Sequence, residues 1–160
     1  MSQASKSISS LLEQWQRERP DIDSRPMAVC GQVWRTADRL RKQVAKNQAK
    51  YDMDSARSDV LFTLRRQGKG SHLSPSELAA EMMLSTSAMT NRLDRLEQKG
   101  LIKRLADPND RRGLKISLTD KGFALADEMV VTHVKIEADM LKNLTQSEQQ
   151  TLISLLAKIA

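Results

Sequence analysis

The sequence predicts a mainly α-helical fold with one small β-hairpin, an α+β class, in a chain of 160 residues. Apolar residues recur at spacings of three and four along most of the chain, for example within residues 8–15, and this is the period of an amphipathic helix. Further along, Leu114, Ile116 and Leu118 alternate with polar residues, which is typical of a half-buried strand. A chain of this length can bury the core of a single domain.

Three helices are predicted in the first half of the chain. A short amphipathic helix begins near Ile8 and ends before Pro20, because proline disfavours helical backbone in the residue that precedes it. A longer helix is expected over about residues 27–50, with an apolar stripe on one side and basic residues opposite. A third helix is expected over about residues 55–67, and it ends at glycines that tolerate a left-handed stop.

A pair of short helices follows. The segment Ser74-Pro-Ser-Glu has the pattern of a capping box with proline in the first turn, so a helix is expected over about residues 75–82. Ser85 or Thr86 is expected to cap another helix, which continues to Lys99 and stops at a glycine. Two short helices joined by a tight turn form a helix-turn-helix.

The predicted hairpin comes directly after this pair. Residues 101–105 and 114–118 have strand character, and residues 106–113 between them are rich in turn formers, so they are expected to form a long loop. A hairpin in this place is a wing, and the whole pattern predicts a winged helix-turn-helix.

A long helix is expected over about residues 119–143, and a second capping box at Thr145 opens the last helix.

Charge and composition narrow the class of partner. The net charge of +6 and the isoelectric point near 9.7 favour a polyanion, although a basic surface can also serve solubility alone. Aromatic residues make up only 3% of the chain, which argues against single-stranded nucleic acids and aromatic RNA-binding modules, since both depend on stacking. Duplex DNA is the nucleic acid that this composition fits best.

The expected compartment is the cytoplasm. Cys30 is the only cysteine, so the chain has no internal disulfide, as is usual in a reducing compartment. No apolar stretch approaches the ~20 residues of a membrane span, and residues 1–10 lack the apolar core of a signal peptide.

The helix over residues 85–99 is predicted to read DNA. On a helical wheel Met89, Leu93 and Leu96 form the core face, and the other side carries hydroxyl, amide and guanidinium groups that can hydrogen-bond base edges. Alone, this pattern also fits a solvated helix face; the capped helix before it and the wing after it favour DNA. The predicted DNA contacts on this helix are Ser85, Thr86, Ser87, Thr90, Asn91 and Arg95.

The wing supplies two more predicted DNA contacts, Arg111 and Arg112, at its tip. Adjacent arginines on a projecting hairpin suit the minor groove and the phosphates. Without the upstream helices, a solvated charged turn would explain them equally well.

Arg92 differs from its neighbours because it lies nearer the core side of the wheel. A charge in that place should be paired, and Asp59 on the third helix is the candidate partner. From these residues alone, a structural ion pair is at least as good an explanation as a ligand site.

The chain resembles the MarR family of bacterial transcription regulators over nearly its whole length. The segments that carry the resemblance are Leu73-Ser-Pro-Ser-Glu-Leu-Ala-Ala, the stretch from Ser87 to Arg104, Asp110-Arg-Arg-Gly and Leu118-Thr-Asp-Lys-Gly. The resemblance implies a homodimer with interlocked N- and C-terminal helices, bound to a pseudo-palindromic operator that it represses. Residues 1–160 would then form one MarR-type domain, with dimerisation helices at about 1–54 and 119–160 and a DNA-binding lobe at about 55–118.

A narrower resemblance is to the urate-responsive subgroup of this family, the PecS/HucR type, through the stretch from Trp15 to Asp23. In that subgroup, four residues link the bound ligand to the DNA-binding lobe, and the resemblance carries them over to Trp15, Asp59, Arg92 and Arg104. An indole can stack on a planar ring, and guanidinium groups can pair with an anion. The implied effector is a small anionic aromatic molecule, with urate first and phenolic acids next.

Other functions fit the sequence less well. Peroxide-sensing members of the family have a reactive cysteine near the position of Cys30, although their nearby tyrosines are replaced here. An enzyme is disfavoured because there is no phosphate-binding glycine loop and no Cys/His cluster, and no catalytic residue, cofactor or metal site is predicted. His133 and Glu137 are better explained as a solvated pair than as a metal site. A non-specific DNA-compacting protein would not need a groove-reading helix.

Overall fold

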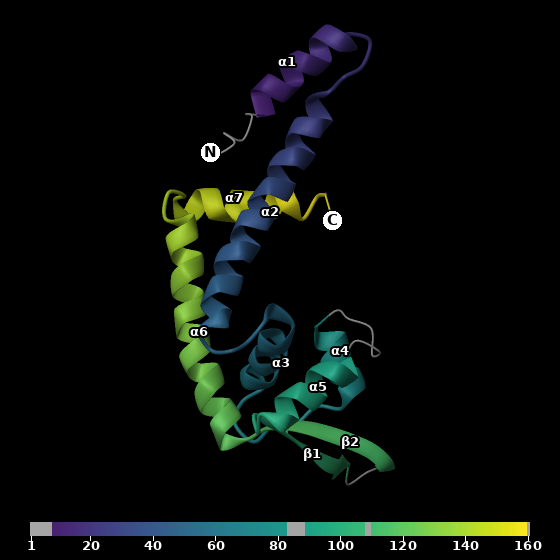
Figure 1. The fold of residues 1–160 in the computed structure, drawn as a ribbon, viewed down its shortest axis with the longest axis vertical. Coiled ribbons are helices and arrows are strands. Elements are labelled where there is room, and N and C mark those ends of the chain that lie inside the picture. Colours follow the sequence, from purple (N-terminus) through teal and green to yellow (C-terminus); the bar gives the residue numbers. More distant parts are fainter. Residues whose placement is uncertain (1–7, 83–88, 108–109, 160) are drawn as a thin grey trace. The chain divides into compact units, whose positions relative to one another are not determined.

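The computed structural model describes residues 8–82, 89–107 and 110–159, with the backbone alone at 110–112, and is shown in Figure 1. The chain divides into two compact units, residues 1–43 and 44–160. Unit 1 contains α1 (Ile8–Glu18) and most of α2 (Arg25–Ala49), and α2 continues into unit 2. The structure thus confirms a helical N-terminal region interrupted near Pro20.

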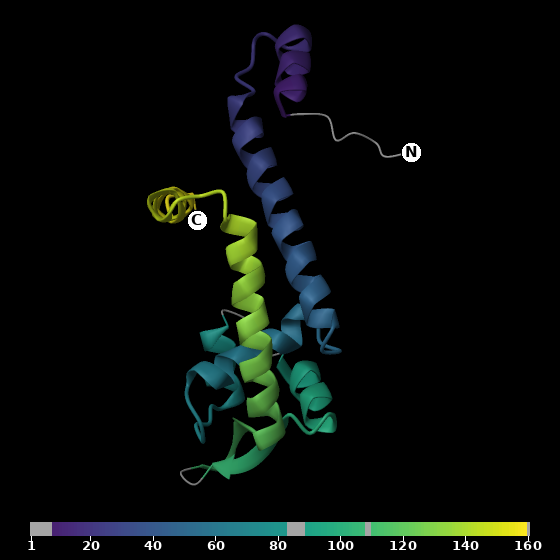
Figure 2. The same cartoon turned by 90° about the vertical axis from the view of Figure 1, so that its left-hand side faces the viewer.

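Unit 2 contains the helix-turn-helix region, the hairpin and the C-terminal helices. Figures 1 and 2 show the hairpin at one end of this unit and α7 at the other, with α6 running between them. The elements are α3 (Ser55–Arg66), α4 (Pro75–Glu81), α5 (Met89–Gln98), β1 (Ile102–Asp107), β2 (Asp110–Leu118), α6 (Asp120–Leu141) and α7 (Gln146–Leu156).

Side chains cap the helices where the sequence places them. Both predicted capping boxes form: Ser74 accepts a hydrogen bond from the Glu77 backbone N–H at α4, and Thr145 does the same for Glu148 at α7. Each box satisfies backbone donors that a helix start leaves open. After α3, Gly68 has a φ of 98°, the left-handed conformation expected at that stop.

The hairpin is longer than the sequence predicts. The antiparallel strands pair from Ile102 with Leu118 to Ala106 with Leu114, and then Asp107 pairs with Asp110 after a shift in register. The predicted long loop over residues 106–113 is therefore not what the structure shows. The strands continue into it because each added pair satisfies further backbone groups, and a shift next to Asp107 accommodates the unequal strand lengths.

The core of unit 2 lies between α3, α5, α6 and the base of the hairpin. The predicted core face of α5 is confirmed, since Met89, Leu93 and Leu96 are at most 2% exposed. They pack in one cluster with residues from the neighbouring elements, including Val60, Leu61, Leu78, Ile102, Ile116, Ala126 and Met129.

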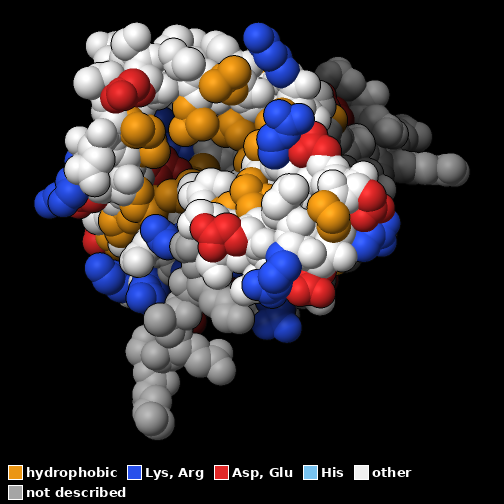
Figure 3. Space-filling model, turned by 90° about the horizontal axis from the view of Figure 1, so that it is seen from above, with side chains coloured by type: hydrophobic (Ala, Val, Ile, Leu, Met, Phe, Trp, Pro, Cys, Tyr) orange, Lys and Arg blue, Asp and Glu red, His pale blue; other side chains and the backbone are white. Residues whose placement is uncertain are grey.

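The C-terminal helix has no such core. No residue of α7 is buried, and Leu152, Ile153, Leu155 and Leu156 are 41–60% exposed. Exposed hydrophobic side chains, orange in Figure 3, are visible among the charged groups of the face shown there. Across the described residues, no helix is both long and apolar enough to cross a membrane.

Candidate nucleic-acid interface

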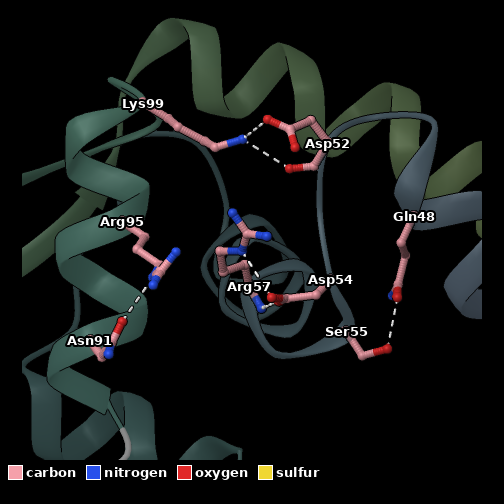
Figure 4. A network of polar contacts seen from close by, with 8 residues as sticks. All are labelled: Gln48, Asp52, Asp54, Ser55, Arg57, Asn91, Arg95 and Lys99. Atoms are coloured by element: carbon pink, nitrogen blue, oxygen red, sulfur yellow. Dashed lines mark hydrogen bonds and ion pairs between the residues drawn. The ribbon is translucent and has the colours of Figure 1, made fainter.

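The side of α5 opposite the core is polar and accessible. Thr90, Asn91 and Arg95 are exposed, and Arg95 Nε donates a hydrogen bond of 3.0 Å to Asn91 Oδ1. Figure 4 shows these two side chains one turn apart on α5, with the Arg95 guanidinium folded back toward Asn91. The pair presents an amide and a guanidinium together, both of which can bond base edges. Ser85, Thr86 and Ser87 lie outside the described residues.

Contacts at the far end of α5 fix this helix against the start of α3. Lys99 Nζ donates to the backbone carbonyl of Asp52 at 2.9 Å and also forms an ion pair with the Asp52 carboxylate. Asp54 caps α3 and forms an ion pair with Arg57 at 3.1 Å. Figure 4 shows Lys99 reaching from the end of α5 to Asp52, with the Asp54–Arg57 contact at the start of α3 nearby.

Arg104 connects the first wing strand to α5. Its side chain is 27% exposed, and its guanidinium forms ion pairs with Asp94, at 2.5 Å, and with Glu97. The hydrogen bond to Asp94 is the main reason that the pKa of Arg104 is raised. Since both carboxylates are on α5, Arg104 couples the position of β1 to that of α5.

The wing is held to α4 by a second lysine. Lys115 Nζ lies 3.0 Å from Glu77 Oε2 and 3.5 Å from Asp107 Oδ2, and its side chain is only 18% exposed. The backbone and hydroxyl of Ser74 together with Lys115 lower the pKa of Glu77 to about 2. Arg111 and Arg112 lie within β2; their side chains are outside the described part of the structure.

The predicted direct ion pair between Asp59 and Arg92 is not formed: among the described residues, no salt bridge within 4.0 Å joins them. Asp59 is exposed, yet partial loss of water around its carboxylate raises its pKa, and electrostatic interactions with Arg92 and His133 oppose the rise only in part. The reason is geometric: helix spacing places both residues on neighbouring helices but does not bring their side chains into contact.

His133 lies beside this pair of charges. Its ring is 5.2 Å from that of Phe62, and its Nε2 is 3.1 Å from Glu137 Oε1. The other ring nitrogen, Nδ1, is buried and has no hydrogen-bond partner among the described residues. Asp59, Arg92, Phe62 and His133 thus combine two opposite charges with two flat rings. No group of three metal-binding side chains occurs in the part of the chain that the structure describes.

The remaining candidates belong to unit 1. Trp15 lies on α1 with 38% of its surface exposed, and Cys30 lies exposed on α2.

The sequence did not reveal the roles of Lys99, Lys115 and Gly122. A weak signal existed for Gly122, a glycine inside the first turns of a helix, which suggests close packing.

A helix-turn-helix with an exposed polar second helix and an antiparallel wing defines a winged-helix DNA-binding protein. A model of the MarR family matches residues 55–114. The chain is 39% identical to the HTH-type transcriptional regulator PecS of Dickeya dadantii over 95% of its own length and 92% of that protein. The chain belongs to the MarR family, whose function is transcriptional regulation rather than catalysis.

Other relatives and solved structures agree. The multiple antibiotic resistance protein MarR of Escherichia coli is 34% identical over 68% of this chain and 74% of that protein. A mutant of the same protein complexed with operator DNA superposes with a TM-score of 0.73 at 26% identity, covering 91% of this chain and 96% of the other. BpsR of Bordetella bronchiseptica superposes with a TM-score of 0.70 at 25% identity, covering 82% of this chain and 97% of the other. The DNA binding of BpsR is described as regulated by 6-hydroxynicotinic acid.

Proposed function

We propose that the chain, as a homodimer, binds a pseudo-palindromic operator, represses transcription there and is released by a small anionic aromatic ligand, with urate as the first candidate. The observation that carries DNA recognition is the exposed polar side of α5, where Thr90, Asn91 and Arg95 lie opposite a fully buried face. These side chains would read the major groove. Ser85, Thr86, Ser87, Arg111 and Arg112 would add contacts to bases and phosphates.

The exposed apolar residues of α7 support the homodimer. A helix with no buried residue and four apolar side chains at least 41% exposed is stabilised when a second copy covers it. The terminal helices of residues 1–54 and 119–160 would interlock. Two-fold symmetry would then place the two copies of α5 about 34 Å apart, one turn of DNA. With DNA as partner, the protein would act in the cytoplasm on the nucleoid.

The ligand would act through α5, which carries both the reading face and Arg92. An anion beside Arg92 would repel the Asp59 carboxylate, whose pKa is already raised by partial desolvation. A shift of α5 would reach β1 directly through the ion pairs of Arg104. Trp15 would stack on the aromatic ring of the ligand. Release requires that the ligand bind the form with low DNA affinity more tightly. The acid that regulates BpsR is itself an aromatic carboxylate, which supports this ligand class.

The test is fluorescence anisotropy with labelled DNA from upstream of the protein's own coding sequence, over a salt series, with and without urate. We expect specific binding that weakens steeply with salt, since phosphate contacts release counterions, and full release by urate. No binding even at low salt would refute the DNA-binding part. Specific binding that only organic peroxide releases would favour redox sensing through the exposed Cys30 instead.

Two variants separate the ligand site from the DNA site. Arg92→Gln and Asp59→Asn should bind the operator but need far more urate for release. Arg41→Gln, which removes an exposed charge from unit 1, is the control for loss of charge alone. A normal urate response in both of the first two variants would place the effector elsewhere.

A further inference from the structure

A concave site lies in unit 2, on the opposite face of β1 from Arg104. It is a cavity of about 210 Å³ at the meeting point of the end of α3, the hairpin base and the start of α6. It is lined by Leu64, Gly68, Lys69, Gly70, Ser71, Lys103, Leu105, Ser117, Leu118, Thr119, Asp120 and Phe123. Neither Asp59 nor Arg92 lines it, so it is separate from the ligand site proposed above.

The charges of the cavity favour an anion. Lys69 and Lys103 both line it, and none of the ion pairs within 4.0 Å among the described residues includes either lysine. Lys69 Nζ lies 5.6 Å from the centre of the Phe123 ring, a contact that holds the ammonium beside the cavity. The backbone N–H groups at the start of the 22-residue α6 add partial positive charge. The Asp120 carboxylate opposes these groups, which leaves two cations against one anion.

Apolar side chains also line the cavity, so the anion that binds there should carry an apolar group as well. Leu64, Leu105, Leu118 and Phe123 line the cavity, and Phe123 is fixed by the Arg65 guanidinium 4.2 Å from its centre. Ser71 and Ser117 are already bonded to each other, since the Ser117 hydroxyl donates to the Ser71 carbonyl at 3.0 Å. The volume is below the roughly 300 Å³ at which pockets for drug-sized ligands begin, so the occupant is small.

We propose that this cavity binds a small organic carboxylate with an apolar body, its carboxylate between Lys69 and Lys103 and its body against Leu105 and Phe123. Successive residues of a strand face opposite sides, so Lys103 and Leu105 meet the ligand while Arg104 holds α5. A ligand in this cavity would therefore contact β1, the strand whose Arg104 is ion-paired to α5.

Calorimetric titration of the full chain with benzoate tests the site. Wild type should bind benzoate, and benzamide, which has the same shape without the charge, should not bind. Lys69→Gln with Lys103→Gln should weaken benzoate binding at least about tenfold, because two charge-assisted contacts are lost. Leu105→Trp, which fills the cavity and keeps both charges, should weaken it similarly. Thermal melts would show that these exposed substitutions leave the fold intact.

Two controls keep this site distinct from the one at Arg92. Lys135→Gln with Lys142→Gln removes two exposed charges, on α6 and at its C-cap, outside the cavity and should bind benzoate like wild type. Arg92→Gln should keep the benzoate binding that Lys69→Gln with Lys103→Gln loses, even if benzoate also binds weakly at the site proposed beside Arg92. Unchanged affinity in the cavity variants, loss of binding in Arg92→Gln, or absence of binding to wild type at millimolar benzoate would each overturn the proposal.

Discussion

At the scale of single residues, Arg104 joins the first wing strand to α5, the helix that we propose reads DNA. Its guanidinium bonds Asp94 and Glu97, which belong to the same helix as Thr90, Asn91 and Arg95. Only 27% of its side chain is exposed, although the two partner carboxylates are more accessible, at 48% and 39%. Arg104 thus ties α5 to β1 through two ion pairs.

Replacing Arg104 by Gln should weaken operator binding about tenfold, since the loss of charge-assisted hydrogen bonds leaves two carboxylates facing each other on α5. Fluorescence anisotropy at fixed salt would measure the change. Arg17→Gln, which removes an exposed ion pair with Glu18, should bind DNA like wild type. Equal affinities for the two variants would show that Arg104 has no positioning role.

Glu77 combines two tasks, since its carboxylate closes the capping box of α4 and accepts from Lys115 of the wing. Its pKa is lowered to about 2 in the folded state, against roughly 4.3 for an unperturbed glutamate. A lowered folded pKa means that the stabilisation is fully present above the unfolded pKa and is lost as the pH falls toward the folded value.

Glu77→Gln should therefore lower the melting temperature at pH 7, and the difference from wild type should shrink as the pH falls from about 4.5 to 2. Thermal melts followed by circular dichroism at a series of pH values would measure it. A difference between the two proteins that stays constant down to pH 2 would contradict the ionic origin of the effect.

At the scale of elements, the start of α6 packs closely on the base of the hairpin. A Cβ atom built on Gly122 would lie 1.8 Å from the Leu101 carbonyl oxygen, far inside contact distance. The Thr119 hydroxyl strengthens the same junction by donating to the Gly100 carbonyl at 2.7 Å. Because the neighbour of Gly122 is backbone, it cannot move aside as a flexible side chain would.

Gly122→Ala should destabilise the fold by about 3 kcal/mol or more, although alanine is normally the better helix former. Urea unfolding would give the free energy of unfolding. Gly31→Ala provides the matched control, since the added Cβ would meet nothing within 4 Å on α2 and should be neutral or slightly stabilising. A neutral Gly122→Ala would mean that α6 can shift away from the hairpin without cost.

At the scale of the whole molecule, apolar residues form a buried core in the helix-turn-helix region, whereas the C-terminal helix α7 has no buried residue. In the helix-turn-helix region apolar side chains are buried, whereas on α7 they remain exposed in the isolated chain. This contrast is expected when the core of the second region is completed by another subunit.

Leu155→Asp should shift the protein from dimer to monomer and reduce operator binding strongly, because it places a charge among side chains that we expect to be covered. Leu155 is 52% exposed in the single chain, so the subunit fold itself should tolerate the change. Sedimentation equilibrium would measure the association. Gln150→Asp adds the same charge on the other side of α7 and should leave the dimer intact; dissociation by both would indicate a charge effect alone.

The sequence by itself determined the order of the elements, the two capping boxes and the buried face of α5. These features depend on residues within one or two turns of each other, so local periodicity and side-chain chemistry are enough to predict them. The resemblance to a known family also came from the sequence, and the comparisons confirmed it. The roles of the individual DNA-contacting and ligand-contacting residues stay predictions.

Only the tertiary structure decided which distant groups meet. It extended the hairpin past Leu105, paired Arg104 with α5, joined Lys115 to Glu77 and left Asp59 without a direct bond to Arg92. Such partners are separated by many residues, and whether two side chains come within bonding distance depends on how helices and strands pack. A charge pattern in the sequence gives the candidates for an ion pair, and packing selects among them because Coulomb attraction and hydrogen bonds act over only a few ångströms in water.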